Sequence, residues 1–120
     1  MTESATETTA AAFVHSAVTT DLEADWGPLV EAVGQQMDTR GTQLWTDGSA
    51  DCGIWESTPG PSRWEMDQHE MITILSGRMT VTADDGTTTE LGPGDCAFFP
   101  RGWKGNWLIT ETIRKAYALF

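Results

Sequence analysis

The sequence predicts an all-β domain, either a sandwich or a barrel, and three observations support this fold class. From Gln36 onward, short apolar runs alternate with turn signals instead of forming long helical patterns. The 120 residues include 12 Gly and 5 Pro, a content that favours many turns. The runs 79–82 and 87–91 flank the turn residues Asp84-Asp85-Gly86, and this pattern is typical of a β-hairpin.

A chain of 120 residues and 13.1 kDa has room for one hydrophobic core. Residues 1–11 are mostly Thr, Ala, Glu and Ser, so we expect them to form a disordered tail. We therefore predict a single domain over residues 12–120.

The first part of this domain predicts a short extension of strand and helix. Residues 13–18 indicate a short strand. Residues 21–33 predict a short helix, with Asp25 as the cap and Pro28 in the first turn. Its apolar stripe consists of Leu29, Val30 and Val33.

The remaining apolar runs predict the strands of the sheet, and turn signals such as Ser76-Gly77 separate them. Closure of these strands into a barrel is expected to remove exposed strand edges. The predicted strands are 42–45, 53–56, 71–75, 78–83, 96–99, 106–109 and 112–120.

Charge excludes several classes of partner. The chain has 7 basic and 18 acidic residues and a formal net charge of −11. Such a charge repels nucleic acids and anionic membrane surfaces. No apolar run approaches the roughly 20 residues needed to span a bilayer. The first residues are acidic and rich in Thr, unlike a secretory signal, so we expect a cytoplasmic protein. We expect Cys52 and Cys96 to be buried thiols.

Two motifs resemble those of the cupin superfamily. Glu70 and Gly77 have the spacing of the family's first motif, and Gly94, Pro100 and Gly102 have that of the second. Together with segments 53–60 and 111–117, they are similar to small single-domain cupins grouped with the ureidoglycine aminohydrolase cupin domain. The resemblance covers about residues 42–120. It implies a double-stranded β-helix, the cupin jelly-roll barrel (RmlC-like).

The resemblance also implies a metal site, but this sequence departs from it. Family members hold the metal with a His-x-His pair and a Glu from the first motif and a His from the second. Trp64, Met66 and Gly105 stand at the three histidine positions, so only Glu70 remains. A tight transition-metal site needs about three or more protein donors, so we expect no metal cofactor. The open alternative is a divalent metal held by His69 and Glu70, with Cys96 or His15 as further donors.

Strand alternation predicts what replaces the metal. If Glu70 faces the interior, Trp64 and Met66 share its face and His69 points outward. Gly105 would open space beside Trp107, which leaves one carboxylate in an aromatic-walled pocket. The expected ligand-binding residues are Trp55, Trp64, Met66, Trp103, Trp107 and Tyr117, although each Trp is also a good core residue.

Glu70 is the candidate catalytic group. A carboxylate among indoles is expected to have a raised pKa, which suits a general acid or base, unless a cation pairs with it. Arg63 has the opposite strand parity and is expected to point away, and Arg114 and Lys104 are expected to be surface charges. The possible cationic partners are Arg78, Arg101, Lys104, Arg114 and Lys115.

These features leave two main hypotheses open. The protein is a small-molecule-binding cupin that catalyses metal-independent acid–base chemistry with Glu70, as an isomerase, lyase or hydrolase. Alternatively, it is a non-catalytic ligand-binding or sensing cupin that has lost its metal site. A third reading is a partner protein recognised by its acidic surface. Because small cupins commonly pair, we expect a homodimer built on sheet packing.

Overall fold

A computed structural model describes residues 9–120. These residues form eight strands and no helix, so the all-β fold class is confirmed. Most of the tail predicted at 1–11 lies outside them. None of the described residues belongs to a helix that could cross a membrane. The strands are β1 (Ala24–Pro28), β2 (Asp38–Thr46), β3 (Asp51–Ser57), β4 (Gly60–Glu65), β5 (Glu70–Ala83), β6 (Thr88–Leu91), β7 (Cys96–Phe99) and β8 (Lys104–Leu119).

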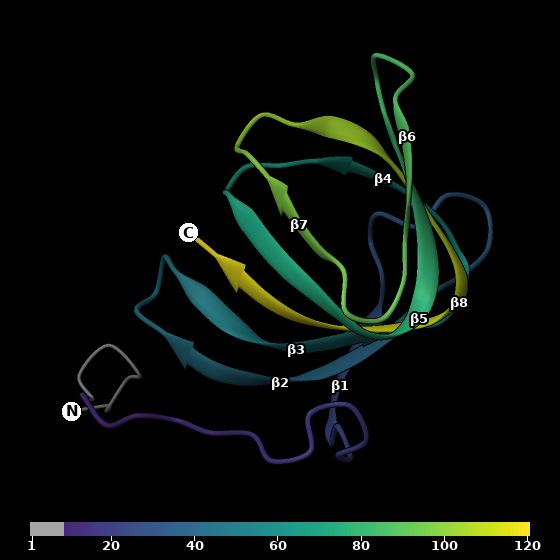
Figure 1. Cartoon of the computed structure of the whole chain (residues 1–120). Helices are drawn as coiled ribbons and strands as arrows, with labels where there is room; N and C mark the ends of the chain where they lie inside the picture. Colours follow the sequence, from purple (N-terminus) through teal and green to yellow (C-terminus); the bar gives the residue numbers. More distant parts are fainter. Residues whose placement is uncertain (1–8) are drawn as a thin grey trace.

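The two longest strands, β5 and β8, form the spine of a strongly curved antiparallel sheet (Figure 1). They pair from Glu70 opposite Leu119 to Ala83 opposite Gly105. β5 also pairs with β7 and then with β6, and β8 pairs with β4 and then with β3. Beyond β3, the sheet continues through β2 to β1. This curved, all-antiparallel arrangement agrees with the jelly roll that the sequence resemblance implies.

β5 bends at residues 76–78, where its register with β8 shifts. Gly77 has a φ angle of 87°, and a Cβ at this position would collide with the carbonyl oxygen of Thr112. Glycine therefore permits a bulge at which the strand turns without ending. For this reason, the two strands predicted between residues 71 and 83 are one strand. The two predicted between 106 and 120 likewise merge into β8.

The sheet does not close into a complete barrel. Among the described residues, β1 and β6 are the ends of the path of paired strands. The expectation that closure removes exposed strand edges is therefore wrong. Both end strands are short, and the pairing of β1 with β2 is irregular. Short, irregular edge strands limit pairing with other chains.

The helix predicted at 21–33 is also wrong. Residues Ala24–Pro28 form β1 and pair with β2, and Gly27 has a φ angle of 76°, outside the helical region. Val30 and Val33 are 92% and 53% exposed, so the apolar stripe is not buried. Without a buried face, a segment this short lacks the tertiary contacts that stabilise a helix.

The strand predicted at 13–18 is a turn instead. The carbonyl oxygen of Ser16 accepts hydrogen bonds from the amides of Thr19 and Thr20. The Arg114 guanidinium binds this segment from β8, because its Nη1 donates to the carbonyl oxygens of Ala17 and Thr20. Arg114 also forms a 3.0 Å ion pair with Glu56 and is only 6% exposed. It is therefore not the surface charge that we predicted.

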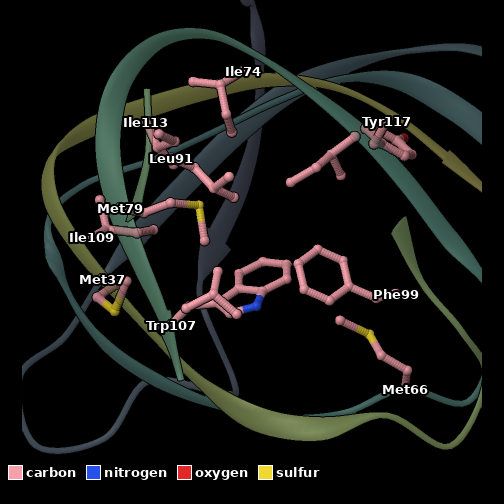
Figure 2. Packing of buried hydrophobic residues seen from close by; sticks show 12 residues of the cluster. Met37, Met66, Ile74, Met79, Leu91, Phe99, Trp107, Ile109, Ile113 and Tyr117 are labelled. Carbon is pink, nitrogen blue, oxygen red and sulfur yellow. The ribbon is translucent and has the colours of Figure 1, made fainter. Parts of the chain in front are cut away.

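The concave side of the sheet holds the hydrophobic core, shown in Figure 2. Glu70, Ile72 and Ile74 of β5 are buried, whereas Met71 between them is 42% exposed. The inward face of β5 is thus the one that strand parity predicts. Aliphatic side chains fill one part of the core, and Trp107, Phe99 and Met66 fill another (Figure 2).

Candidate functional site

A cleft of about 300 Å³ lies where the start of β5 meets the end of β8. It brings together five of the seven residues predicted for the site, namely Glu70, Trp55, Trp64, Met66 and Tyr117. Trp103 and Trp107 do not line it. The cleft is also lined by Trp26, Glu31, Asp51, Glu65, Asp67, Gln68, Lys115 and Leu119.

A buried ion pair forms the floor of this cleft. The Lys115 ammonium donates a hydrogen bond to Oε2 of Glu70 over 2.7 Å. The two side chains are only 4% and 6% exposed. Adjacent strands hold them, since β5 and β8 pair throughout this region. Of the cationic partners that the sequence left open for Glu70, the structure selects Lys115.

Aromatic rings enclose the Lys115 ammonium. Its Nζ lies 4.4 Å from the ring centroid of Trp55 and 4.5 Å from that of Trp107. Trp55 is the direct neighbour of Lys115 across the β3–β8 ladder, which places its ring beside the ammonium. The ring faces carry partial negative charge and stabilise the cation electrostatically. The ammonium therefore has one carboxylate and two indole faces around it.

Trp107 lies in the core directly behind the wall of the cleft. It is fully buried, and its ring centroid lies 4.4 Å from that of Trp64 and 5.2 Å from that of Phe99. Figure 2 shows Trp107 and Phe99 side by side in the core. Trp64 is the cleft-facing member of this stack, and its Nε1 donates to Oγ of Ser62. The stack and this hydrogen bond fix the orientation of the Trp64 ring.

Gly105 does not open space beside Trp107, contrary to our expectation. A Cβ at this glycine would overlap the ring of Trp103 and approach the carbonyl oxygen of Thr82. Trp103 packs edge-on against Phe99, with ring centroids 4.9 Å apart, and lines a separate apolar cleft beside β6 and β7. The Trp103 ring thus occupies the space that a side chain at position 105 would enter.

Tyr117 lines the cleft with a polar tip that already has a partner. Its hydroxyl donates a 3.1 Å hydrogen bond to Oδ1 of Asp51. Burial raises the pKa of Tyr117 well above its ordinary value, and the nearby Asp51 carboxylate raises it further. Tyr117 is therefore a neutral hydrogen-bonding group under ordinary conditions.

The segment before the sheet also contributes to the cleft. Trp26 of β1 lies over Gly41, where any larger residue would collide with the indole ring. Glu31 lies in the connection between β1 and β2, and its carbonyl oxygen accepts a hydrogen bond from the amide of Arg63. Neither Trp26 nor Glu31 was predicted for the site, because both lie in the segment for which the sequence predicts a helix.

His69 takes part in a different cluster. Its Nδ1 accepts a 2.9 Å hydrogen bond from the amide of Arg101. The ring packs against Phe98 and Phe120, with centroid distances of 5.6 and 5.5 Å. Its backbone pairs with Phe120 through two hydrogen bonds. His69 therefore lies among outer-face aromatics, and the structure does not place it on the cleft.

The residues present do not fit the metal of the cupin family. Glu70, the only residue that matches a ligand position of the resemblance, already binds an ammonium cation. Among residues 9–120, no group of three or more His, Cys, Asp or Glu could hold a metal ion. His15 is exposed. Cys96 is exposed and contacts Thr73, and Cys52 is half-buried, so neither cysteine is the buried thiol that we predicted.

Comparison with known proteins identifies the family of this chain. The model of the EutQ-like cupin domain matches residues 44–117. No curated protein matches the chain. The finer resemblance to the ureidoglycine aminohydrolase group is not confirmed by these matches, whereas a small cupin is.

Solved structures show the same fold. A Pseudomonas syringae protein of unknown function is 23% identical, with a TM-score of 0.76 over 86% of this chain. The chain spans only 46% of that protein. A Thermotoga maritima protein is 37% identical, with a TM-score of 0.54, and the match covers 56% of this chain and 76% of that one.

The polyketide cyclase RemF from Streptomyces resistomycificus is 25% identical, with a TM-score of 0.62, over 82% of this chain and 73% of RemF. The fold, the motif spacing and the family match agree with one another. The chain belongs to the EutQ-like cupin domain family.

Proposed function

We propose that this protein binds a small organic molecule in the tryptophan-lined cleft and acts on it by acid–base chemistry without a metal. The observation that carries the proposal is the 2.7 Å ion pair between Glu70 and Lys115 on the cleft floor. A buried ion pair is weak evidence for stability, because the cost of desolvation offsets most of the attraction. A buried carboxylate and ammonium in a cleft are therefore candidates for function.

The pair contains both groups that a proton transfer needs. The Glu70 carboxylate can accept a proton from a substrate C–H, N–H or bound water. The Lys115 ammonium can donate a proton to, or hydrogen bond with, an oxygen on which negative charge develops. These roles suit an isomerase, lyase or hydrolase acting on a small metabolite. The similarity to RemF, a polyketide cyclase, supports a substrate that is organic.

The walls would orient the substrate. Trp55 and Trp64 offer ring faces, and Tyr117 with Asp51 offers a fixed polar edge. A volume of about 300 Å³ is at the lower end of known ligand sites, which favours a small molecule.

The test is a screen of a metabolite library for ligands that raise the melting temperature, followed by mass analysis of each ligand after incubation. We expect at least one ligand to be converted, and we expect Glu70→Gln to abolish that conversion while binding persists. Glu111→Gln is the matched control, because Glu111 is exposed and its ion pair with Arg78 is 3.8 Å long. Circular dichroism checks that each variant folds. Unchanged turnover in Glu70→Gln would rule out the catalytic role.

A non-catalytic binding or sensing module is the second candidate function. The observation that favours it is that Glu70 and Lys115 satisfy each other and are almost completely buried. In that case the screen would find ligands that stabilise the protein and are recovered unchanged.

We also propose that the protein is a homodimer built on sheet packing. Met71, Phe98 and Phe120 are between 42% and 51% exposed and form an apolar face beside His69. Apolar side chains gathered in this way are typical of interfaces. A monomer by light scattering would refute the dimer.

A further inference from the structure

The mouth of the cleft is strongly acidic. Five of the residues that line the whole cleft are acidic, Glu70 on the floor among them, and Lys115 is the one basic residue of its lining. Because Lys115 is bound to Glu70, its charge does not offset those of Glu31, Asp51, Glu65 and Asp67. Lys104 approaches Glu65 to 3.7 Å, but both side chains are more than half exposed, so solvent screens this pair. The net charge of −11 on the whole chain reinforces the local field.

Tryptophan rings line the same space. Trp26, Trp55 and Trp64 all face the cleft, and none of them is fully buried. Indole faces stabilise ammonium and guanidinium groups, most strongly when the cation is partly desolvated. The protein itself supplies an example, because the Lys115 ammonium lies 4.4 Å from the Trp55 ring.

The charges also define an orientation. The Lys115 ammonium on the floor repels a second cation, whereas the exposed carboxylates of Glu65 and Asp67 at the mouth attract one. A ligand with one charged end would therefore place its cation at the mouth, against Trp26 and Trp64. Its uncharged end would reach the Glu70–Lys115 pair.

We propose that the ligand of this cleft is a small organic cation that carries an alkylammonium or guanidinium group at one end. The proposal rests on the proposed function, in that it names the chemical class of the molecule bound there. The cation is seated between tryptophan faces and carboxylates at the mouth, and the uncharged part occupies the floor.

The test compares three probes of nearly equal shape by calorimetry and tryptophan fluorescence. They are choline, its uncharged carbon analogue 3,3-dimethylbutan-1-ol, and the anion 3,3-dimethylbutanoate. We expect choline to bind about tenfold more tightly than the alcohol, from the cation–π contribution alone. We expect the anion to bind most weakly, and added salt to weaken choline but not the alcohol.

Two pairs of variants locate the binding. Trp64→Leu should lose most of the choline affinity, whereas Trp45→Leu, the same change at a tryptophan outside the cleft, should not. Glu65→Gln should weaken choline and leave the alcohol unchanged. Glu90→Gln on β6 is its control, because Glu90 is exposed and does not line the cleft.

The remaining outcomes overturn the proposal in distinguishable ways. Equal binding of choline and the alcohol, both sensitive to Trp64→Leu, overturns the preference for cations and leaves the proposed function intact. Tighter binding of the anion does the same. Choline binding that ignores Trp64→Leu and Glu65→Gln places the cation outside the cleft and overturns this inference. If no probe binds at millimolar concentration, the cation assignment is wrong, and the library screen decides the proposed function separately.

Discussion

Arg114 and Lys115 are neighbours in β8, point to opposite faces of the sheet, and are both buried. Each forms an ion pair with a glutamate, at 3.0 Å for Arg114 with Glu56 and 2.7 Å for Lys115 with Glu70. The environments of the two pairs differ in what else the cation contacts. Arg114 also donates to two backbone carbonyl oxygens, whereas Lys115 otherwise faces aromatic rings.

This difference separates a structural pair from a functional candidate. The planar guanidinium of Arg114 binds several acceptors at fixed angles and so joins β3, β8 and the segment 16–20. Glu56 is held in addition by Arg40. The compact ammonium of Lys115 donates to the Glu70 carboxylate and lies on a cleft. The Arg114 guanidinium therefore has few donors left for a ligand, whereas the Lys115 ammonium can still bind one.

The largest expected effect on stability comes from breaking the Glu70–Lys115 ion pair, which lies on the inner face of the sheet. Lys115→Met leaves the Glu70 carboxylate buried without its cation, which should lower the free energy of unfolding by about 3–5 kcal/mol. The double variant Glu70→Leu with Lys115→Met should recover most of this loss, because two apolar groups then replace two charges. Urea denaturation measures both. Losses that simply add in the double variant would contradict the assignment of this pair as costly to bury.

The Glu56–Arg114 ion pair on the opposite face should respond differently when the single and double variants are compared in the same way. Arg114→Met combined with Glu56→Leu should not recover stability, because the carbonyl oxygens of Ala17 and Thr20 lose their donor wherever Arg114 is replaced, in the single Arg114→Met variant and in the double variant alike. We expect a remaining loss of about 2–3 kcal/mol. Limited proteolysis should also show faster cleavage within residues 9–23. Full recovery of stability would mean that the backbone contacts of Arg114 contribute nothing.

A smaller effect concerns pH. Burial alone would raise the pKa of Glu56, but hydrogen bonds from Arg40 and Arg114 outweigh it and hold the pKa below its ordinary value. Stability from this group is therefore present above the ordinary pKa and is lost as the pH falls through the lowered one. Glu56→Gln should flatten the dependence of unfolding free energy on pH in this acidic range. An unchanged slope would show that Glu56 is not the responsible group.

The smallest effect appears at alkaline pH. Tyr117 is the only tyrosine, so ultraviolet absorbance reports its ionisation directly. Burial, followed by the Asp51 charge, raises its pKa, so we expect no phenolate near pH 10 in the folded protein. The folded state then holds a proton that the unfolded state releases, and stability falls as the pH rises above about 10. Asp51→Asn should move the onset of ionisation downward, and an onset already near pH 10 in the native protein would contradict the contact.

The sequence predicted the sheet well where glycine, proline and alternation act locally. The strand at 96–99 and the hairpin of β5 and β6 agree with the structure, as does the inward face of Glu70. The prediction failed at 21–33, because Pro28 and the nearby valines suit a helix start as well as an exposed loop. The choice depends on burial, which local pattern does not determine.

The site was predictable only in part for a similar reason. Its tryptophans near the motifs could be found by parity, but Lys115 is selected by a register that joins residues 45 positions apart. Trp26 comes from an edge strand outside both motifs. Trp103 and Trp107 are tryptophans like those of the cleft walls, so residue type alone does not separate them from the site. Only the packing shows that Trp107 is a core residue and that Trp103 lines a different cleft.

The close approach of the Trp103 ring to Gly105 has a consequence for which substitutions this part of the sheet accepts. Gly105→His alone would drive a side chain into an indole, and a smaller residue in place of Trp103 alone would open a void beside Phe99. Both single steps are harmful, although the pair of changes together need not be. Such a dependence couples the two positions, so we expect a side chain at position 105 to be accommodated only together with a smaller residue at position 103.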